Sequence, residues 1–171
     1  MDNMDKEQKY CYVCGEKLTE KQCKDEGVVK YCGHCEEFRF PLYSSAVSMV
    51  IFNPKKDKIL LIQQYGMKSN ILVAGYINKG ETPQQALQRE IKEEVGLNAV
   101  EWNYNDSMYF DKTETLMHNF VVVVDSENLK IKENEVDTAQ WFTVKEAVEY
   151  IRPNSMAKKF LLKSLKGRNV I

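Results

Sequence analysis

No cysteine occurs after residue 35, and no apolar run approaches the ~18 residues of a membrane span. The first ten residues, MDNMDKEQKY, lack the apolar segment of a secretory signal. Neither sign of charge is in excess, because the net charge is −1. These absences argue against a membrane partner, a secreted protein and a dedicated binder of nucleic acid or anionic lipid. We therefore expect a cytoplasmic protein.

The cysteines that are present form a recognisable pattern near the start of the chain. Cys11, Cys14, Cys32 and Cys35 make two C-x2-C pairs with seventeen residues between them, a spacing typical of a zinc site. Four thiolates complete a tetrahedral site, so the Zn²⁺ is predicted to be structural and His34 to be exposed. Few apolar residues lie here, so the metal would hold this segment together. The fifth cysteine, Cys23, is expected to be a free thiol.

Two domains are expected, a small zinc ribbon over 1–40 and a larger domain over 41–171. The sequence Phe40-Pro41-Leu42 is the predicted joint between them. In the larger domain, apolar runs predict strands, the first two paired as a β-hairpin across the turn NPKKD. The predicted strands cover 44–53, 58–65, 70–77, 99–110, 116–125 and 140–144.

Helices are predicted from capping residues and apolar spacing. Thr82 as N-cap, Pro83 at the first helical position and Gln85 three after the cap start a helix over 83–95, which Gly96 ends. Leu87, Ile91 and Val95 form its predicted core-facing seam. A second capping box, Thr143 with Glu146, starts the helix KEAVEYI, and a last helix spans 154–166. The fold class is α+β.

The helix over 83–95 carries a crowded acidic stripe. Glu90, Glu93 and Glu94 share a face about 100° wide beside the apolar seam, although like charges at this spacing repel. Such carboxylates suit Mg²⁺, which prefers oxygen ligands. A solvated acidic face is the alternative reading of these residues alone. We expect the stripe to lie at the edge of a buried face.

The surrounding segment GYINKGETPQQALQREIKEEVGL follows G-x5-E-x7-R-E-(aliphatic)-x-E-E-x-G-(aliphatic). This is a complete Nudix box, and the chain resembles the Nudix hydrolase family. The resemblance implies a mixed β-sheet between helices, with the box as a loop–helix–loop. It also implies hydrolysis of a diphosphate that joins a nucleoside to another moiety, with Mg²⁺ or Mn²⁺ as cofactor.

The same resemblance implies roles for individual residues. Glu90, Glu93 and Glu94 would be metal ligands, with the Gly75 carbonyl as a fourth, and Arg89 would fix a glutamate by a bidentate pair. Glu81 would serve the loop structurally. A later glutamate often joins such sites, and in ENEVDTAQWF we favour Glu135 over Glu133. The general base could be any of three residues, Glu93, Glu94 or Glu135.

A cysteine-rich ribbon ahead of a Nudix domain resembles the NADH pyrophosphatases. The knuckle CGHC, Phe40-Pro41 and Thr115-Leu116-Met117 are similar to theirs, whereas SMYFDKT stands where they carry S-Q-P-W-P-F-P. Tyr109 and Phe110 in this stretch either stack on a substrate base or pack into the core. We expect NADH or ADP-ribose to be a better substrate than nucleoside triphosphates, and NAD-capped RNA ends are a further candidate substrate. The resemblance also implies a homodimer.

Two other functions are alternatives to hydrolysis. A zinc-ribbon nucleic-acid adaptor would favour a basic ribbon face, but EKLTEKQCKDEGVVK alternates in charge. A nucleotide sensor on an inactive Nudix scaffold should have lost box carboxylates, which this chain retains. His118, in the strand LMHNFVVVV, is either a structural residue or a substrate contact.

Overall fold

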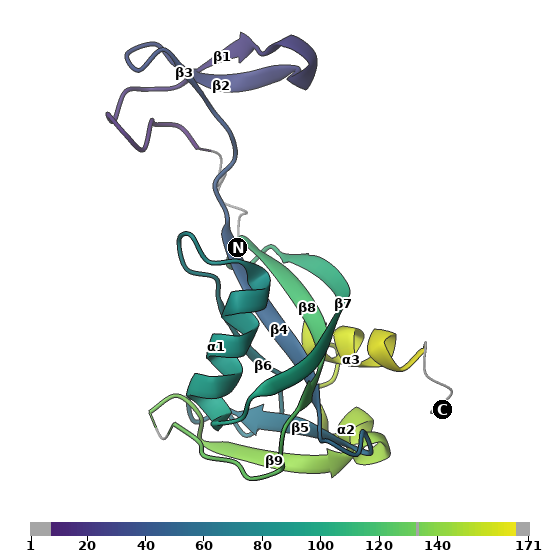
Figure 1. Cartoon of the computed structure of the whole chain (residues 1–171). Helices are drawn as coiled ribbons and strands as arrows, with labels where there is room; N and C mark the ends of the chain where they lie inside the picture. Colours follow the sequence, from purple (N-terminus) through teal and green to yellow (C-terminus); the bar gives the residue numbers. More distant parts are fainter. Residues whose placement is uncertain (1–7, 133, 167–171) are drawn as a thin grey trace. The chain divides into compact units, whose positions relative to one another are not determined.

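The computed structural model describes residues 8–132 and 134–166 of the 171-residue chain. The chain divides into two compact units, Met1–Tyr43 and Ser44–Ile171, which are described separately below (Figure 1). Glu133, the alternative to Glu135, lies outside the described residues.

The N-terminal unit holds a small antiparallel sheet in the order β1-β2-β3. Its strands are β1 (Thr19–Gln22), β2 (Val28–Cys32) and β3 (Glu37–Arg39), with one 3-10 turn at Lys24–Glu26. The sequence did not predict these strands, because they are short and partly polar. The buried apolar side chains here are Cys11, Leu18 and Cys32, with Cys35 packed against them. The apolar core of this unit is therefore built around cysteines.

The second unit contains a six-stranded mixed sheet within the described residues. The order is β7-β8-β4-β5-β9, and β6 also pairs with β4. The strands are β4 (Ser44–Phe52), β5 (Lys58–Gln63), β6 (Val73–Tyr76), β7 (Ala99–Phe110), β8 (Thr115–Val124) and β9 (Thr138–Thr143). All six were expected from the sequence, with differences at their ends.

Strand β4 is the centre of this sheet. It runs parallel to β8 from the pair Ser44↔Thr115 to Phe52↔Val123, and antiparallel to β6 on its other side. Because both faces of β4 are covered, its residues read as a continuous apolar run. The expected hairpin with β5 is confirmed near the turn, at Phe52↔Ile59. Farther from the turn β5 pairs with β9 instead.

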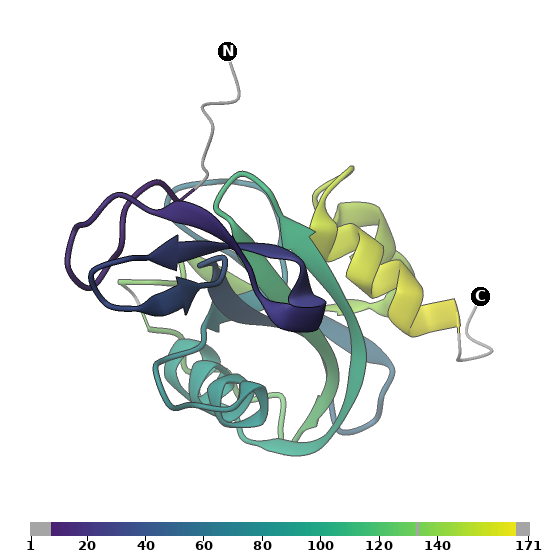
Figure 2. The same ribbon diagram turned by 90° about the horizontal axis from the view of Figure 1, so that it is seen from above.

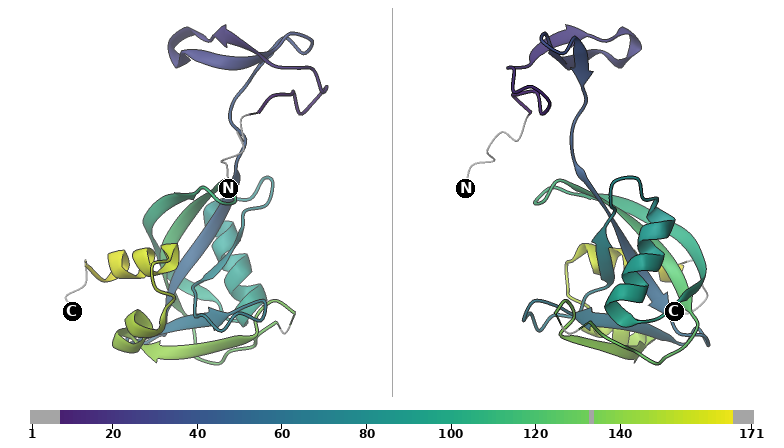
Figure 3. Two further views of the ribbon diagram at one scale, coloured as in Figure 1. Left: turned by 180° about the vertical axis from the view of Figure 1, so that it is seen from behind. Right: turned by 60° about the vertical axis from the view of Figure 1, so that its left-hand side comes forward.

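Helices cover both faces of the sheet, which confirms a mixed sheet between helices. Helix α1 (Pro83–Val95) packs on one face, and α2 (Val144–Tyr150) and α3 (Met156–Lys166) pack on the other. Figure 2 and both views of Figure 3 show α1 and α3 on opposite sides of the sheet. No helix in the described part of the chain is long and apolar enough to cross a membrane.

Local capping explains where α1 begins and ends. The Thr82 hydroxyl accepts the Gln85 amide, and the Gln85 side chain accepts the Thr82 amide at 2.8 Å, so the predicted capping box is present. Gly96 adopts φ 73°, the left-handed conformation that ends a helix and favours glycine. Thr143 and Glu146 form the second predicted box at the start of α2. The caps therefore fix where α1 and α2 begin and where α1 ends.

Candidate active site

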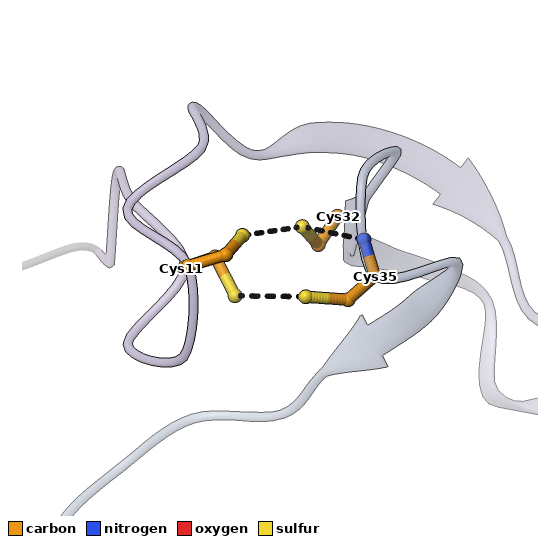
Figure 4. A group of neighbouring side chains, drawn as sticks. Cys11, Cys32 and Cys35 are labelled. Carbon is orange, nitrogen blue, oxygen red and sulfur yellow. Dashed lines mark hydrogen bonds between the residues drawn. The ribbon is translucent and has the colours of Figure 1, made fainter.

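Four cysteine side chains meet in the N-terminal unit. The Sγ atoms of Cys11, Cys14, Cys32 and Cys35 lie within 4.8 Å of one another. Figure 4 shows Cys11, Cys32 and Cys35 pointing toward a common centre. The structure thus brings together all four predicted zinc ligands. Cys23 is half-buried and His34 is exposed, and neither belongs to this cluster.

The loops formed by the two C-x2-C pairs and the residue after each, here called knuckles, reverse the chain direction at residues of different types. In the first, Gly15 adopts φ 79° and its amide donates to the Cys11 carbonyl at 2.8 Å. In the second, the left-handed residue is Glu36, at φ 56°. The Cys35 amide donates to the Cys32 sulfur at 3.4 Å there. Both knuckles therefore aim their thiols inward.

The surroundings of the cluster favour ionisation of the Cys11 thiol and oppose ionisation of the Cys35 thiol. Burial alone would raise the pKa of Cys11, but hydrogen bonds from the Cys14 amide and the Arg39 side chain lower it to about 6. A hydrogen bond with Cys14, followed by burial, raises the pKa of Cys35 to about 12. Full ionisation of the four thiols needs a bound cation, and four sulfur ligands at this spacing suit Zn²⁺.

The acidic face of α1 is less uniform than the sequence suggested. Glu90 and Glu94 are buried, with 8% and 4% of their surface exposed, whereas Glu93 is exposed. The expectation of a stripe at the edge of the core was therefore wrong for two of the three residues. The reason is tertiary, because residues from β6 and the end of β5 lie over Glu90 and Glu94.

Arg89 connects most of the predicted box residues. It donates to both oxygens of Glu81, from Nε at 2.8 Å and from Nη2 at 2.9 Å, which is a bidentate pair. Its Nη1 donates to Glu90 at 2.6 Å and to Glu93 at 3.4 Å. The predicted bidentate contact thus exists, and its partner is Glu81.

Glu81 also stabilises the loop before α1. Its Oε2 accepts the Asn78 amide at 2.9 Å. Hydrogen bonds from Arg89 and from the Asn78 amide hold the pKa of Glu81 down at about 2. Glu81 is therefore ionised and engaged by the protein, in keeping with the structural role expected for it.

Gly75 and Glu90 face each other at close range. A Cβ at position 75 would overlap the Glu90 carboxylate, so no other residue leaves this space open. Burial raises the pKa of Glu90, and Arg89 partly opposes that rise. The missing side chain leaves the carboxylate beside the backbone of β6. A hard cation bound there would reach oxygen ligands from both elements.

Glu94 lies deepest among the acidic residues. Burial, followed by repulsion from Glu90, raises its pKa to about 8. Gln64 donates to its Oε2 at 3.2 Å. A buried carboxylate with a raised pKa is stabilised when a cation binds beside it. The grouping of Glu90, Glu94 and the space at Gly75 therefore fits Mg²⁺ or Mn²⁺ by its donor chemistry.

Glu135 reaches this site from a distant segment. The amides of Lys130 and Lys132 donate to the carbonyls of Val95 and Glu94 at the end of α1, at 2.9 and 3.2 Å. Lys132 also donates to the Glu135 carboxylate at 2.7 Å. These contacts hold the segment against the helix, and Glu135 raises the pKa of both Glu90 and Glu94.

A cavity of about 500 Å³ joins these groups. Glu90, Glu94 and Glu135 line it together with Gly75 and Arg89. The exposed Glu93 is not among its lining residues. A second cavity, of about 630 Å³, lies between the sheet and the start of α3. The two cavities share Ala74, Phe110 and Met117, so they adjoin.

The two aromatic residues proposed to contact substrate are separated by the structure. Phe110 lines both cavities, whereas Tyr109 lines neither. Successive residues of β7 point to opposite faces, which accounts for the difference. His118 lies outside both cavities, with its ring centroid 6.4 Å from that of Tyr104. This position favours a structural role for His118.

The sequence did not predict several residues that line the smaller cavity or contact the cysteine cluster. Gln64, Tyr65 and Tyr76 line the smaller cavity, and Arg39 donates to Cys11 at 3.2 Å. The sequence gives little indication of the cavity residues, because Gln64 and Tyr65 lie at the end of a predicted strand and belong to no recognisable motif. Arg39 carried one usable cue, a lone arginine four residues after the last cysteine.

The mixed sheet between helices and the carboxylates on α1 define a domain of the Nudix type. The NUDIX domain model matches residues 42–162, and the chain belongs to this family.

Curated relatives include the NAD-capped RNA hydrolases NudC of Escherichia coli (strain K12 / DH10B) and of Shigella boydii serotype 18. Each is 28% identical to this chain over 155 residues, which is 90% of this chain. The match spans 58% of the length of those relatives.

Solved structures share the fold. A NUDIX hydrolase from Nitrosomonas europaea aligns with a TM-score of 0.64 at 16% identity, covering 94% of this chain and 92% of its own. The NUDIX domain of Shewanella oneidensis NrtR, solved with ADP ribose, aligns with a TM-score of 0.64 at 13% identity. That alignment covers 80% of this chain and 93% of the NrtR domain.

Proposed function

We propose that the protein hydrolyses the diphosphate bond of a nucleoside diphosphate linked to another moiety, with NADH or ADP-ribose ahead of nucleoside triphosphates. The observation that carries the proposal is the convergence of Glu90, Glu94 and Glu135 on one cavity beside the Nudix-box arginine. Glu90 and Glu94 are buried, and a bound cation would offset the free-energy cost of burying their charges.

The residues of the site have three proposed roles, which are metal binding, orientation of a ligand and acceptance of a proton. Glu90, Glu93, Glu94 and Glu135, with the Gly75 carbonyl, would hold Mg²⁺ or Mn²⁺. When bound, these ions neutralise the diphosphate and lower the pKa of a coordinated water. Arg89 orients Glu90 through its 2.6 Å hydrogen bond. Glu93, Glu94 and Glu135 are the candidates for the group that accepts the proton of the attacking water.

A substrate with two parts suits the two adjoining cavities. The smaller cavity contains the carboxylates, and the larger has mainly apolar walls from the sheet and α3, with Lys112 and Arg152 also lining it. The similarity to NudC, an NAD-capped RNA hydrolase, supports dinucleotides and NAD-capped RNA ends as substrates to test. A homodimer is our expectation from the same resemblance, and sedimentation analysis tests it.

A substrate panel tests the hydrolytic proposal. NADH, ADP-ribose, NAD-capped RNA, ATP and dGTP are incubated with Mg²⁺ or Mn²⁺, and the release of AMP, mononucleotide and phosphate is measured. We expect AMP from NADH and ADP-ribose, and no reaction in excess EDTA. Efficient cleavage of triphosphates with no cleavage of dinucleotides would overturn the substrate claim. Cleavage of none of them would overturn the activity.

We propose further that Cys11, Cys14, Cys32 and Cys35 bind one structural Zn²⁺. Support comes from the four sulfur atoms within 4.8 Å and from the scarcity of other buried apolar side chains in the described part of this unit. Elemental analysis of protein purified without chelators should find one zinc per chain. The variant Cys14→Ser should lose it while metal binding at α1 persists. Absence of zinc from the wild type contradicts the proposal.

A further inference from the structure

The turn after β5 contains a bulky residue in a strained conformation. Tyr65 has φ 55° and Gly66 has φ 70°, and the Met67 amide donates to the Gln64 carbonyl at 3.1 Å. Two central residues with positive φ are the pattern of a type I′ turn, which favours Asn, Asp or Gly at the first position. An aromatic residue there is a genuine backbone outlier.

Specific contacts hold the turn in place. The Gly66 amide donates to Asp137 Oδ2 at 2.7 Å, and the Asp137 amide donates to the Gln63 carbonyl at 2.8 Å. Asp137 is two residues beyond Glu135, so the segment that delivers this carboxylate also fixes the turn. The strained conformation is therefore imposed by the surrounding structure.

Packing does not explain why a tyrosine occupies this position. Tyr65 is 75% exposed, more than any other large hydrophobic side chain in the described residues. It nevertheless lines the cavity that contains Glu90, Glu94 and Glu135. A strained residue that is exposed beside a candidate site points to a role in binding, because strain of this kind concentrates at functional sites.

We infer that Tyr65 is a specificity-determining residue that stacks on the base of the bound nucleotide. The inference rests on the proposed function, which places the diphosphate at the carboxylates of the same cavity. A nucleotide held there by its phosphates has one flat apolar part, and every base offers a face to an aromatic ring. Tyr65 therefore distinguishes nucleosides from sugar phosphates that lack a base.

Three variants distinguish a stacking role of Tyr65 from a purely structural role in the turn. Tyr65→Asn installs a residue that the turn prefers and removes the ring, and Tyr65→Phe keeps the ring. Lys56→Asn is the matched control, because Lys56 also has a left-handed backbone, at φ 59°, but lies in the β4–β5 turn outside both cavities. Each protein is titrated calorimetrically with AMP and with ribose 5-phosphate, and assayed on NADH or the best substrate of the panel.

Tyr65→Asn should weaken AMP binding and raise KM by about 10-fold, with kcat within about twofold of wild type. Ribose 5-phosphate should bind all Tyr65 variants and the wild type equally, because it has no base. The melting temperature of Tyr65→Asn should be unchanged or higher, since the strain is relieved. Tyr65→Phe and Lys56→Asn should match the wild type in AMP binding and KM.

The outcomes separate this inference from the proposed activity. Wild-type AMP affinity and KM in Tyr65→Asn overturn the stacking role while hydrolysis stands, and so does an equal loss of AMP and ribose 5-phosphate binding. Tyr65-dependent AMP binding in a protein that cleaves nothing supports the stacking role and overturns the activity. A wild type that neither binds AMP nor cleaves any nucleotide overturns both.

Discussion

Arg89 binds Glu81 through two parallel hydrogen bonds of 2.8 and 2.9 Å, while the same guanidinium donates to Glu90 at 2.6 Å. The arginine thus connects the loop before α1 to a carboxylate of the cavity. Lysine cannot reproduce this fork, because its ammonium is a compact charge without a planar pair of parallel donors.

Arg89→Lys should therefore lower kcat by at least about 10-fold, since Glu90 loses its orienting contact. The comparison variant is Lys92→Arg, which changes the other cation of the REIKEE segment, paired with Asn98 at 3.0 Å. Steady-state kinetics on the best substrate measures both. Equal kcat values in Arg89→Lys and wild type would contradict the orienting role.

Gly75→Ala tests the close approach of β6 to α1. The added methyl group would occupy the space of the Glu90 carboxylate and displace it. We expect a loss of Mg²⁺ affinity and at least a ~10²-fold loss of activity, because a metal ligand moves. Gly33→Ala is the control, because no heavy atom lies within 4 Å of the Cβ that it adds. Its Mg²⁺ affinity should stay near that of wild type.

The unequal burial of the acidic residues predicts unequal effects on stability. In metal-free protein at neutral pH, Glu94→Gln should raise the free energy of unfolding, because burial next to Glu90 opposes ionisation of the carboxyl and an amide carries no such cost. Glu93→Gln should change it little, since Glu93 is exposed. Both should lower hydrolysis by at least ~10²-fold if both hold the cation. Urea denaturation in EDTA measures stability, and a larger gain from Glu93→Gln would contradict the assigned burial.

Metal-free stability should also depend on pH through Glu94. Its folded pKa is raised to about 8 from the ordinary 4.5, so the folded state binds more protons than the unfolded state between these values. Stability should therefore fall as pH rises from about 4.5 to about 8. Glu94→Gln should flatten this slope. Denaturation curves in EDTA across that range measure it, and an unchanged slope in the variant would contradict the assignment.

Arg39 is predicted to support the cysteine cluster. It is 4% exposed, donates to Cys11 Sγ at 3.2 Å, and its Nη2 has no hydrogen-bond partner among the residues that the structure describes. A four-thiolate zinc site carries excess negative charge, which a buried guanidinium offsets. Arg39→Gln should weaken zinc binding by about 10- to 100-fold in chelator competition. Lys30→Gln removes a surface cation of β2 that pairs with Glu20, and zinc affinity should then be unchanged.

Some features of this protein follow from residues close together in the chain. Helix α1 begins and ends where the sequence predicts, at Pro83–Val95, because Thr82, Gln85 and Gly96 form hydrogen bonds within a few residues of their own positions. The apolar runs likewise predicted the strands of the second unit. The two C-x2-C pairs predicted which thiols would meet, because a two-residue spacer aims both side chains one way.

Other features were decided by the tertiary structure. The burial of Glu90 and Glu94, the central place of β4 beside β8 and the approach of Glu135 to α1 all depend on segments far apart in sequence. The strained turn at Tyr65 depends on Asp137, more than seventy residues later. No local pattern encodes these contacts, because burial and its effect on a pKa depend on which distant side chains exclude water from the group.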